Sequence, residues 1–467
     1  RSDMKTGKAA LRTEAPGPKN RWGIRNVFGF ARDPLGLMRS MRDEYGDVVE
    51  MKVANVPWFL VSHPDDVERV LVKLAKSVKR DSYVEVLERT LGLGLLTSEG
   101  DLWKRQRKLM SQAFTPRRIK TYAETMSAVT DEAATWRDGD TVDLHAEMSR
   151  VTMEVVAAVL FGAGIGPREV AIVSESMDVI NEFYANSPEA VLRLPEWVPT
   201  PRNRALTGAV KKIDAVLYDI IAKRRESGEE RDDLLGTLLA SLDDEGSGMT
   251  DKQLRDEAIT LFLAGHETTA LTLGYTLMLL GQYPDVERRV VAELDAVLGG
   301  RLPTAEDSKA LEYTERVIKE GMRLYPPAWT TGREAAEDLE VGGYTIPKGA
   351  QILTSQWIVH RDARFFPNPE AFDPDRWEKD KTKDMPRYAY FPFGGGPRVC
   401  IGNHFAMMEA ILVLAVVLQR YHFEVVPGQT LKLAPSVTLR PKRGVRAIAQ
   451  KRAQPVAEAS TQTTARV

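Results

Sequence analysis

A single cysteine, Cys400, is the feature that most restricts how this 467-residue chain can fold. One cysteine excludes an intrachain disulfide framework, a zinc finger, an all-cysteine iron–sulfur site and a CxxC redox pair. The fold must therefore be held together by packing, and a hydrophobic fraction of 43% is enough for a substantial core. Since nothing in the cysteine content requires an oxidising compartment, we expect the protein in the cytoplasm.

The residues before Cys400 predict a tight loop that leads into a helix. Residues 391–402 read FPFGGGPRVCIG, in which three glycines and a proline form the loop. A thiol at a helix N-terminus faces unpaired backbone N–H groups and the positive end of the helix dipole, and both favour its thiolate form. Such a thiolate is either a nucleophile or a metal ligand. A nucleophile needs a histidine base, for which His404 is a weak candidate, and a buried inert cysteine is the simplest alternative.

Charge and hydropathy exclude further classes of function. Lys plus Arg number 64 and Asp plus Glu number 66, so the net charge is −2, which argues against a nucleic-acid partner. Residues 1–20 are polar and basic and lack the apolar stretch of a signal peptide. The longest apolar run, Ala410–Leu418, is much shorter than the roughly 20 residues that span a bilayer, so no transmembrane anchor is expected.

The chain is expected to form one large domain over residues 21–451. No internal repeat and no Gly/Ser-rich linker divides its middle. The ends, residues 1–20 and 452–467, are expected to be disordered because their composition is polar and low in bulky apolar side chains.

The predicted domain is mainly α, with a small β-rich subdomain. Its longest helix is predicted from Thr250, a good N-cap, to about Gly281, because Pro284 blocks continuation and opens the next helix. Short strands are predicted at Val48–Val53 and Trp58–Val61, within Leu339–Ser355, and at Val437–Arg446.

The pattern F-G-x-G-x-R-x-C-x-G over residues 393–402 resembles the haem-binding loop of the cytochrome P-450 superfamily. The resemblance extends over nearly the whole chain. It implies the cytochrome P-450 fold, with haem b between the long central helix and the helix after Cys400, and it makes Cys400 the proximal thiolate ligand of the iron. By the same resemblance, the other haem contacts are Phe393 beside the sulfur, Gly402, Ala406 under the porphyrin, and Arg398, Trp103, Arg107 and Arg333 at the propionates.

An E-x-x-R pair, Glu320 and Arg323, precedes the run Leu324–Pro327. Its i, i+3 spacing places both charges on one helix face, where a surface ion pair would be the ordinary interpretation. In the family that this chain resembles, such a pair joins a downstream arginine, here Arg376, in a buried triad that supports the haem loop. The resemblance therefore gives Glu320, Arg323 and Arg376 a structural role.

The segment AGHETT, Ala264 to Thr269, lies in the middle of the predicted long helix. Gly265 costs about 0.5–1 kcal/mol relative to Ala in a helix interior, which predicts a local opening of the helix beside a ligand. The resemblance implies that Glu267 and Thr268 are an acid–alcohol pair that delivers protons to iron-bound dioxygen. His266 is left without a role.

The resemblance implies a haem-thiolate monooxygenase that inserts one oxygen atom from O2 into an apolar substrate, with hydroxylation as the default reaction. A fatty acid is favoured as the substrate, and terpenoids and steroids are the alternatives. Electrons would come from a ferredoxin or flavodoxin with its NAD(P)H-dependent reductase. Two other functions are a peroxide-driven peroxygenase, against which the retained Glu267–Thr268 pair argues, and a non-catalytic haem sensor or electron carrier.

Substrate and partner surfaces are less closely defined by the sequence. Residues 181–204 predict either an apolar lid over a substrate entrance or a helix–loop–helix packed on the core. A basic stretch at residues 104–118 predicts either a docking patch for an acidic electron donor or a solvated helix face. The candidate walls of the substrate chamber are Ala264, Ala328 and Val437.

Overall fold

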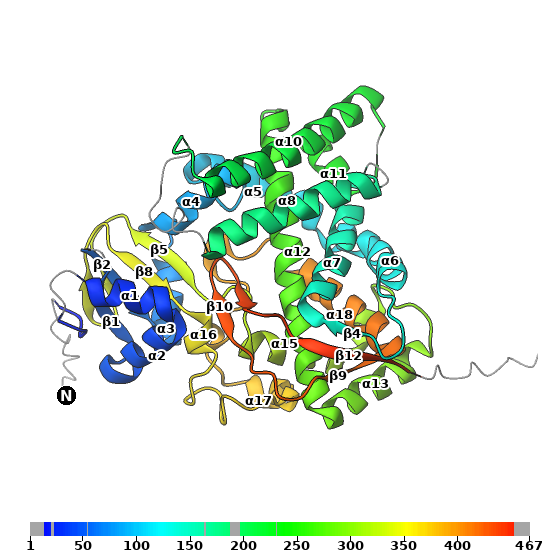
Figure 1. The fold of residues 1–467 in the computed structure, drawn as a ribbon. Helices are drawn as coiled ribbons and strands as arrows, with labels where there is room; N and C mark the ends of the chain where they lie inside the picture. The colour runs from blue at the N-terminus through cyan, green and yellow to red at the C-terminus, as the bar shows by residue number, and fades with distance from the viewer. Residues whose placement is uncertain are drawn as a thin grey trace, which may run out of the picture.

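The computed structural model describes residues 14–19, 23–53, 55–162, 165–186, 197–229 and 231–452. Most of the two ends that were expected to be disordered, and the middle of the predicted lid, lie outside these ranges. Figure 1 shows a large helical part, crossed by one long helix, with a β-rich lobe on one side. The predicted class, mainly α with a small β-rich part, is confirmed.

The long central helix is α12, Asp251–Gln282, as predicted. A capping box begins it, because the Thr250 hydroxyl accepts from the backbone N–H of Gln253 at 3.2 Å and the Gln253 side chain accepts from the backbone N–H of Thr250 at 3.0 Å. Pro284 opens the next helix, α13 (Pro284–Leu298). Most of α12 is buried, so it forms the axis on which the rest of the helical part packs (Figure 1).

The helix is continuous through residues 264–269, which corrects the expectation of a local opening at Gly265. The glycine has a packing reason instead. A Cβ at this position would come within 3.3 Å of the Val156 Cγ2 atom, on helix α7 (Leu144–Phe161). Gly265 therefore lets α7 lie close against α12.

The helix after Cys400 is α18, Asn403–Arg420, which packs against α6, α12 and α15. It is long and apolar enough to cross a membrane, but most of its residues are buried inside the protein, as expected of a core helix. The helices that surround α12 and α18 and matter for the site are α4 (Ser82–Leu91), α5 (Gly100–Ser111), α6 (Pro116–Ala133), α8 (Pro167–Asn186), α10 (Pro201–Ser227) and α15 (Glu312–Leu324).

The β-rich lobe contains a five-stranded sheet in the order β1-β2-β8-β5-β3. The predicted hairpin pairs antiparallel, and β8 then joins β2 in parallel. Strand β5 pairs antiparallel with β8 and places Arg333 opposite Ile352. The bounds are β1 Val48–Val53, β2 Val56–Val61, β3 Val78–Lys79, β5 Thr331–Ala335 and β8 Gln351–Thr354, and a separate hairpin joins β6 Leu339–Val341 to β7 Tyr344–Ile346.

The single strand predicted at Val437–Arg446 is wrong. The chain forms β10 and β11, which pair with each other, and then turns at Gly444, whose φ is 67°. Pro441 has no N–H with which to continue a ladder, and a positive φ interrupts extended backbone. The bounds are β10 Leu433–Pro435, β11 Leu439–Pro441 and β12 Arg446–Lys451, and β12 lies between β4 (Thr141–Asp143) and β9 (Tyr421–Val425) in a second sheet.

Candidate active site around Cys400

The loop before α18 holds the Cys400 sulfur by its backbone. The N–H of Cys400 donates to the Phe393 carbonyl at 3.0 Å, and the N–H of Gly402 donates to the sulfur. Burial raises the pKa of the Cys400 thiol, whereas the Gly402 N–H and the nearby Arg107 guanidinium lower it. The Cys400 side chain is surrounded by protein on most sides, but part of it is accessible. A ligand can therefore reach the sulfur. A cation bound to the sulfur would stabilise its deprotonated, thiolate form.

Cationic side chains gather beside this sulfur. Arg107 donates to the Val399 carbonyl at 2.8 Å, and Arg398 pairs with Glu99 at 2.7 Å while its guanidinium lies 4.6 Å from the centre of the Trp103 ring. Burial is the main cause that lowers the pKa of Arg333. The positive charge of the nearby Arg398 is the second cause.

This donor set fits a haem. A thiolate is a soft ligand suited to iron, and neighbouring guanidinium groups suit the carboxylates of two propionates. The structure therefore brings together the residues that the resemblance assigned to the haem on the Cys400 side: Trp103, Arg107, Arg333, Phe393, Arg398, Cys400, Gly402 and Ala406, whose N–H donates to the Gly402 carbonyl at 2.7 Å.

Glu320, Arg323 and Arg376 lie together in the interior. The Glu320 carboxylate accepts from Arg323 Nη2 and from Arg376 Nε, each at 2.8 Å, and the side chains of Glu320 and Arg323 are fully buried. Trp377 Nε1 donates to the same carboxylate at 2.9 Å. The remaining partners of the group are the N–H of Asp373 on Glu320, and the carbonyls of His360, Pro369 and Ala371 on Arg323.

His360 connects this buried group to the Cys400 loop, a connection that sequence reasoning missed. Its carbonyl accepts from Arg323 at 2.9 Å, and its Nε2 accepts from the N–H of Phe391 at 3.0 Å. Burial lowers the pKa of His360 well below its usual value, so the ring is neutral and can accept. No local pattern predicts this role, because the two partners lie 37 and 31 residues away.

The middle of α12 carries Glu267 and Thr268. The Thr268 hydroxyl donates to the Ala264 carbonyl at 2.7 Å and is partly exposed. Glu267 is buried, and its Oε1 accepts from Arg440 Nε at 2.6 Å and from the Thr438 hydroxyl at 3.3 Å. Sequence reasoning missed Arg440 and Thr438, because they approach from the C-terminal strands.

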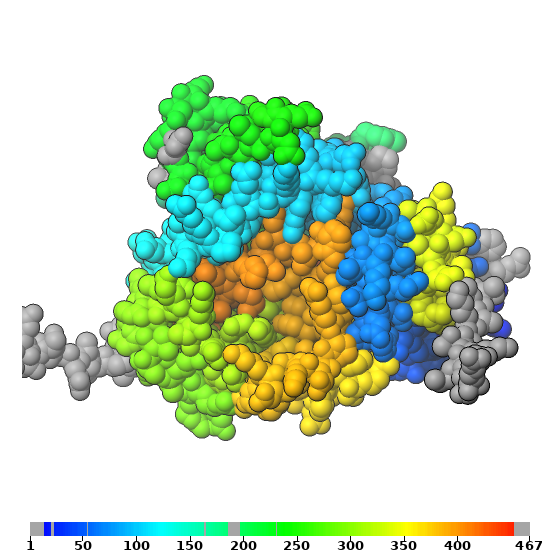
Figure 2. Space-filling view, turned by 180° about the vertical axis from the view of Figure 1, so that it is seen from behind, coloured from blue at the N-terminus to red at the C-terminus, as the bar shows by residue number. Residues whose placement is uncertain are grey.

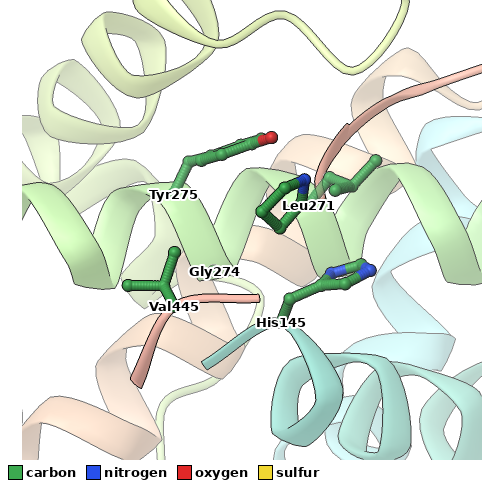
Figure 3. Close-up of a pocket in the computed structure, with 6 residues that line it drawn as sticks. His145, Leu271, Gly274, Tyr275 and Val445 are labelled. Atoms are coloured by element: carbon green, nitrogen blue, oxygen red, sulfur yellow. The ribbon is translucent and has the colours of Figure 1, made fainter. Parts of the chain in front are cut away.

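Tyr275 positions the strand that carries Arg440. Its hydroxyl donates to the Leu439 carbonyl at 2.8 Å, which fixes β11 against α12. In Figure 3 the tyrosine and Leu271 of α12 face His145 of α7 and Val445 around a small cavity. The cavity has a volume of about 10 Å³, room for about one water molecule. Arg440 is therefore held by close packing rather than by a flexible loop.

Two more titratable side chains lie buried on or against α12. Glu409 of α18 accepts from the Thr269 hydroxyl at 3.2 Å, and its burial raises its pKa to about 8. His266 is hydrogen-bonded to Ser149 at 2.8 Å, and burial lowers its pKa to about 4. Sequence reasoning left His266 unassigned and missed Glu409, whose signal was a lone acid at the start of an apolar run.

The three residues predicted to form the substrate walls are accessible to different extents. Ala264 is exposed, and Ala328 and Val437 are partly exposed. Of the predicted lid residues, Tyr184 is packed in the core with its hydroxyl 2.8 Å from that of Thr90, and Phe183 is buried beside it. By contrast, 81% of Trp197 is exposed. Val198 is partly exposed, and Leu192 and Leu194 lie outside the described residues.

The basic stretch borders the Cys400 side of the molecule. In Figure 2 the orange segment that leads to α18 lies beneath the cyan helices α5 and α6, which carry these residues. Four of the cations are paired with carboxylates, which reduces the net positive charge of this surface. The pairs are Lys104 with Asp101, Arg105 with Asp243, Lys108 with Asp244, and Arg118 with Asp232.

Comparisons with known proteins place this geometry among haem enzymes. The family model described as Cytochrome P-450 matches residues 15–446. The chain is 36% identical to "Cyclooctatin synthase" of Streptomyces melanosporofaciens, over 88% of this chain and 90% of the relative. It is 33% identical to "Pentalenene oxygenase" of Streptomyces avermitilis, over 90% of this chain and 94% of the relative.

Solved structures agree with these sequence relatives. A cyanobacterial protein solved with retinoic acid bound is 26% identical and superposes with a TM-score of 0.82, covering 95% of this chain and 100% of that chain. The haem domain of a cytochrome designated P-450DA is 25% identical, with a TM-score of 0.85, covering 95% of this chain and 99% of that chain.

Proposed function

Since this chain belongs to the cytochrome P-450 family, and is an oxidoreductase that binds haem through a cysteine thiolate, we propose that it inserts one oxygen atom from O2 into a cyclic terpenoid. The sequence favoured a fatty acid, but the two relatives reported above are named for cyclooctatin and pentalenene, which favours a terpenoid. The accessible side chain of Ala264 and the partly exposed Ala328 and Val437 support a chamber for a bulky apolar molecule.

When bound, the haem supplies the redox-active iron at which dioxygen is activated. Cys400 would hold the iron, and the Gly402 N–H would stabilise negative charge on its sulfur. On the other side, Arg440 and Thr438 occupy Oε1 of Glu267, which leaves Oε2 as the atom that we assign to carry the proton. The Thr268 hydroxyl, whose hydrogen lies on the Ala264 carbonyl, offers its oxygen lone pairs to an incoming donor.

We assign electron supply to a separate ferredoxin or flavodoxin with its NAD(P)H-dependent reductase, in the cytoplasm. The cyan helices beside the Cys400 segment are the docking face that this assignment uses (Figure 2). Because several of its cations are already paired, we expect partner binding to depend only moderately on salt. A peroxide-driven enzyme is the alternative, and the buried Glu267 with its Arg440 partner favours the oxygen-dependent route.

One observation carries the proposal: Cys400 is an accessible thiol that has backbone and guanidinium support. The test is the spectrum of the reduced protein with carbon monoxide. We expect a strongly red-shifted Soret band in the wild type, loss of that band in Cys400→His, and no change in His404→Gln as a matched control. Absence of haem from the wild type, or a red-shifted band in Cys400→His, would contradict the haem-thiolate assignment.

The substrate class is tested by low-to-high-spin shifts with terpenoids, fatty acids and steroids. We expect the largest shifts with cyclic terpenoids, and a product that is one oxygen atom heavier when O2 and an electron donor are supplied. Larger shifts with fatty acids would restore the original expectation. Equal turnover with hydrogen peroxide alone would favour the peroxygenase.

A further inference from the structure

The loop of residues 92–98 is seated on α12 by two adjacent buried carboxylates. Asp256 Oδ2 accepts from the N–H of Leu93 at 3.0 Å, and Glu257 Oε2 accepts from the N–H of Leu95 at 2.9 Å. Both acids are buried. A charged acceptor binds a backbone N–H more strongly than a neutral one does, so Asp256, which is paired with Arg255 and Lys252, makes the stronger of the two bonds.

The loop backbone approaches α12 more closely than any side chain would allow. Gly92 has a φ of 62°, and a Cβ there would overlap the Asp256 carboxylate. A Cβ on Gly94 would overlap the Thr260 hydroxyl. On its other side the loop is held by Gln106 of α5, whose side chain donates to the Leu93 carbonyl at 2.7 Å. The two glycines of the Gly-Leu-Gly sequence are therefore fitted to Asp256 and Thr260 of α12.

Asp256 also connects this loop to helix α10. Its Oδ1 accepts from Arg255 Nη1 at 3.0 Å, and the other side of the Arg255 guanidinium pairs with Asp214 of α10 at 2.6 Å. Lys252 pairs with Asp256 at 2.8 Å. Since Arg255 and Asp256 are buried, this chain of charges is weakly screened by solvent. This chain of charges connects the loop to α10.

The other end of the loop meets the Cys400 side of the site. The Ser98 carbonyl accepts from Arg398 at 3.0 Å, and Glu99 pairs with the same guanidinium. Leu95 packs with the core residues of α12. Leu93 and Leu96 keep exposed fractions of 37% and 43%, so the loop presents apolar surface where it is most tightly held.

Glu257 is held in this position against a cost in stability. Its second oxygen, Oε1, is buried without a hydrogen-bond partner among the described residues. Burial, and to a smaller extent the charge of Asp256, raises the pKa of the acid to about 8. A polar atom buried without a partner opposes folding. Groups retained at such a cost are characteristic of functional positions.

We propose that Asp256 and Glu257 are positioning residues for substrate binding, which hold residues 92–98 as one wall of the substrate chamber and couple that wall to α10 through Arg255 and Asp214. The proposal rests on the proposed function, since it takes the chamber to lie above Cys400. A molecule that fills the chamber then stabilises the loop and α10 together, because both are tied to the same buried charges.

The first test measures amide hydrogen exchange in the haem-loaded enzyme without any ligand. We expect Asp256→Ala and Glu257→Ala to accelerate exchange at Leu93 and Leu95, respectively, by about 10- to 100-fold. Glu257→Gln, which keeps an acceptor of the same shape, should retain most of the protection. The matched control is Asp244→Ala, an exposed acid. Unchanged exchange at Leu93 and Leu95 would overturn the proposal.

The second test uses 4-phenylimidazole and imidazole, which both bind haem iron but differ in the apolar group that fills the chamber. In the wild type we expect only 4-phenylimidazole to slow exchange both in the loop and in α10 around Asp214. Arg255→Gln should abolish the effect on α10 and leave that on the loop. Glu257→Ala should raise the Kd of 4-phenylimidazole about tenfold and that of imidazole less than about twofold.

These results separate the two proposals. An equal rise in the Kd of both imidazoles in Glu257→Ala would overturn the positioning role. So would amide exchange in α10 that 4-phenylimidazole still slows in Arg255→Gln. A wild type that binds no haem would overturn the proposed function instead. The exchange rates at Leu93 and Leu95, measured then in the purified full-length protein, would still decide whether the two acids hold the loop.

Discussion

The two supports of the active site are built in opposite ways. Behind the Cys400 loop, Glu320 and Arg323 are fully buried, and both oxygens of Glu320 and all three guanidinium nitrogens of Arg323 are hydrogen-bonded. Along α12, three buried polar atoms have no hydrogen-bond partner in the described part of the chain: Oε1 of Glu257, Nδ1 of His266 and, on the facing helix, Oε1 of Glu409.

The difference separates rigidity from reactivity. A buried ion group with all its hydrogen bonds made has one stable arrangement, so the Glu320–Arg323 group suits a loop that must hold iron in one place. Buried titratable groups with spare atoms can change protonation or partner, which suits the side where protons and substrate arrive. The predictions below test this contrast.

The largest expected effect comes from disrupting the buried Glu320–Arg323 pair. Arg323→Ala leaves Glu320 buried without its main partner, and we expect a loss of about 3–5 kcal/mol in the free energy of unfolding, together with lower haem content. The control is Arg289→Ala, whose exposed pair with Asp375 should contribute less than about 1 kcal/mol. The measurement is chemical denaturation with haem quantified in parallel. Equal losses in the two variants would remove the contrast.

Substitutions of Glu267 and Thr268 in α12 should have a smaller effect on stability but a large effect on turnover. Glu267→Gln and Thr268→Ala should lower product formation by about 100-fold, because each removes a group that holds or moves a proton. The haem content and the carbon-monoxide spectrum should not change. Thr276→Val, two turns further along the same helix, is the matched control. Normal turnover in both Glu267→Gln and Thr268→Ala would show that protons take another route.

The smallest effect concerns Glu409, whose folded-state pKa is raised to about 8 by burial. The folded protein then keeps a proton that the unfolded chain releases above about pH 4.5, so this acid makes stability fall as pH rises towards 8. We expect the free energy of unfolding to fall by about 1.4 kcal/mol per pH unit from this group between about pH 5.5 and 7.5. Glu409→Gln should remove that slope, whereas Glu124→Gln, an exposed acid on α6, should keep it. Equal slopes in wild type and Glu409→Gln would contradict the assignment.

The sequence predicted those parts of the fold that depend on neighbouring residues. Thr250, Pro284 and the hairpin strands carry local signals for caps and turns, and the structure agrees with them. Gly265 was misinterpreted because an absent Cβ serves helix packing as well as helix opening, and the two uses look alike in sequence.

The site residues that were missed share a different property. Thr438 lies 171 residues from Glu267, and His360 lies 31 residues from Phe391. Such partners leave no periodicity or spacing near the residues they serve. The positions of Cys400, Glu267 and Thr268 could be proposed from motifs, but the atoms that hold them required the structure.

The strand that carries Thr438 and Arg440 has a consequence for how the protein is made. Glu267 is synthesised long before its partners, and at about 5–20 residues per second the ribosome takes roughly ten seconds or more to reach them. Until then Glu267 has neither its cation nor its hydroxyl donor, and the emerging α12 carries an uncompensated acid. This half of the site is therefore completed late in synthesis. The enzyme can become active only after its C-terminal strands have been made and have packed against α12.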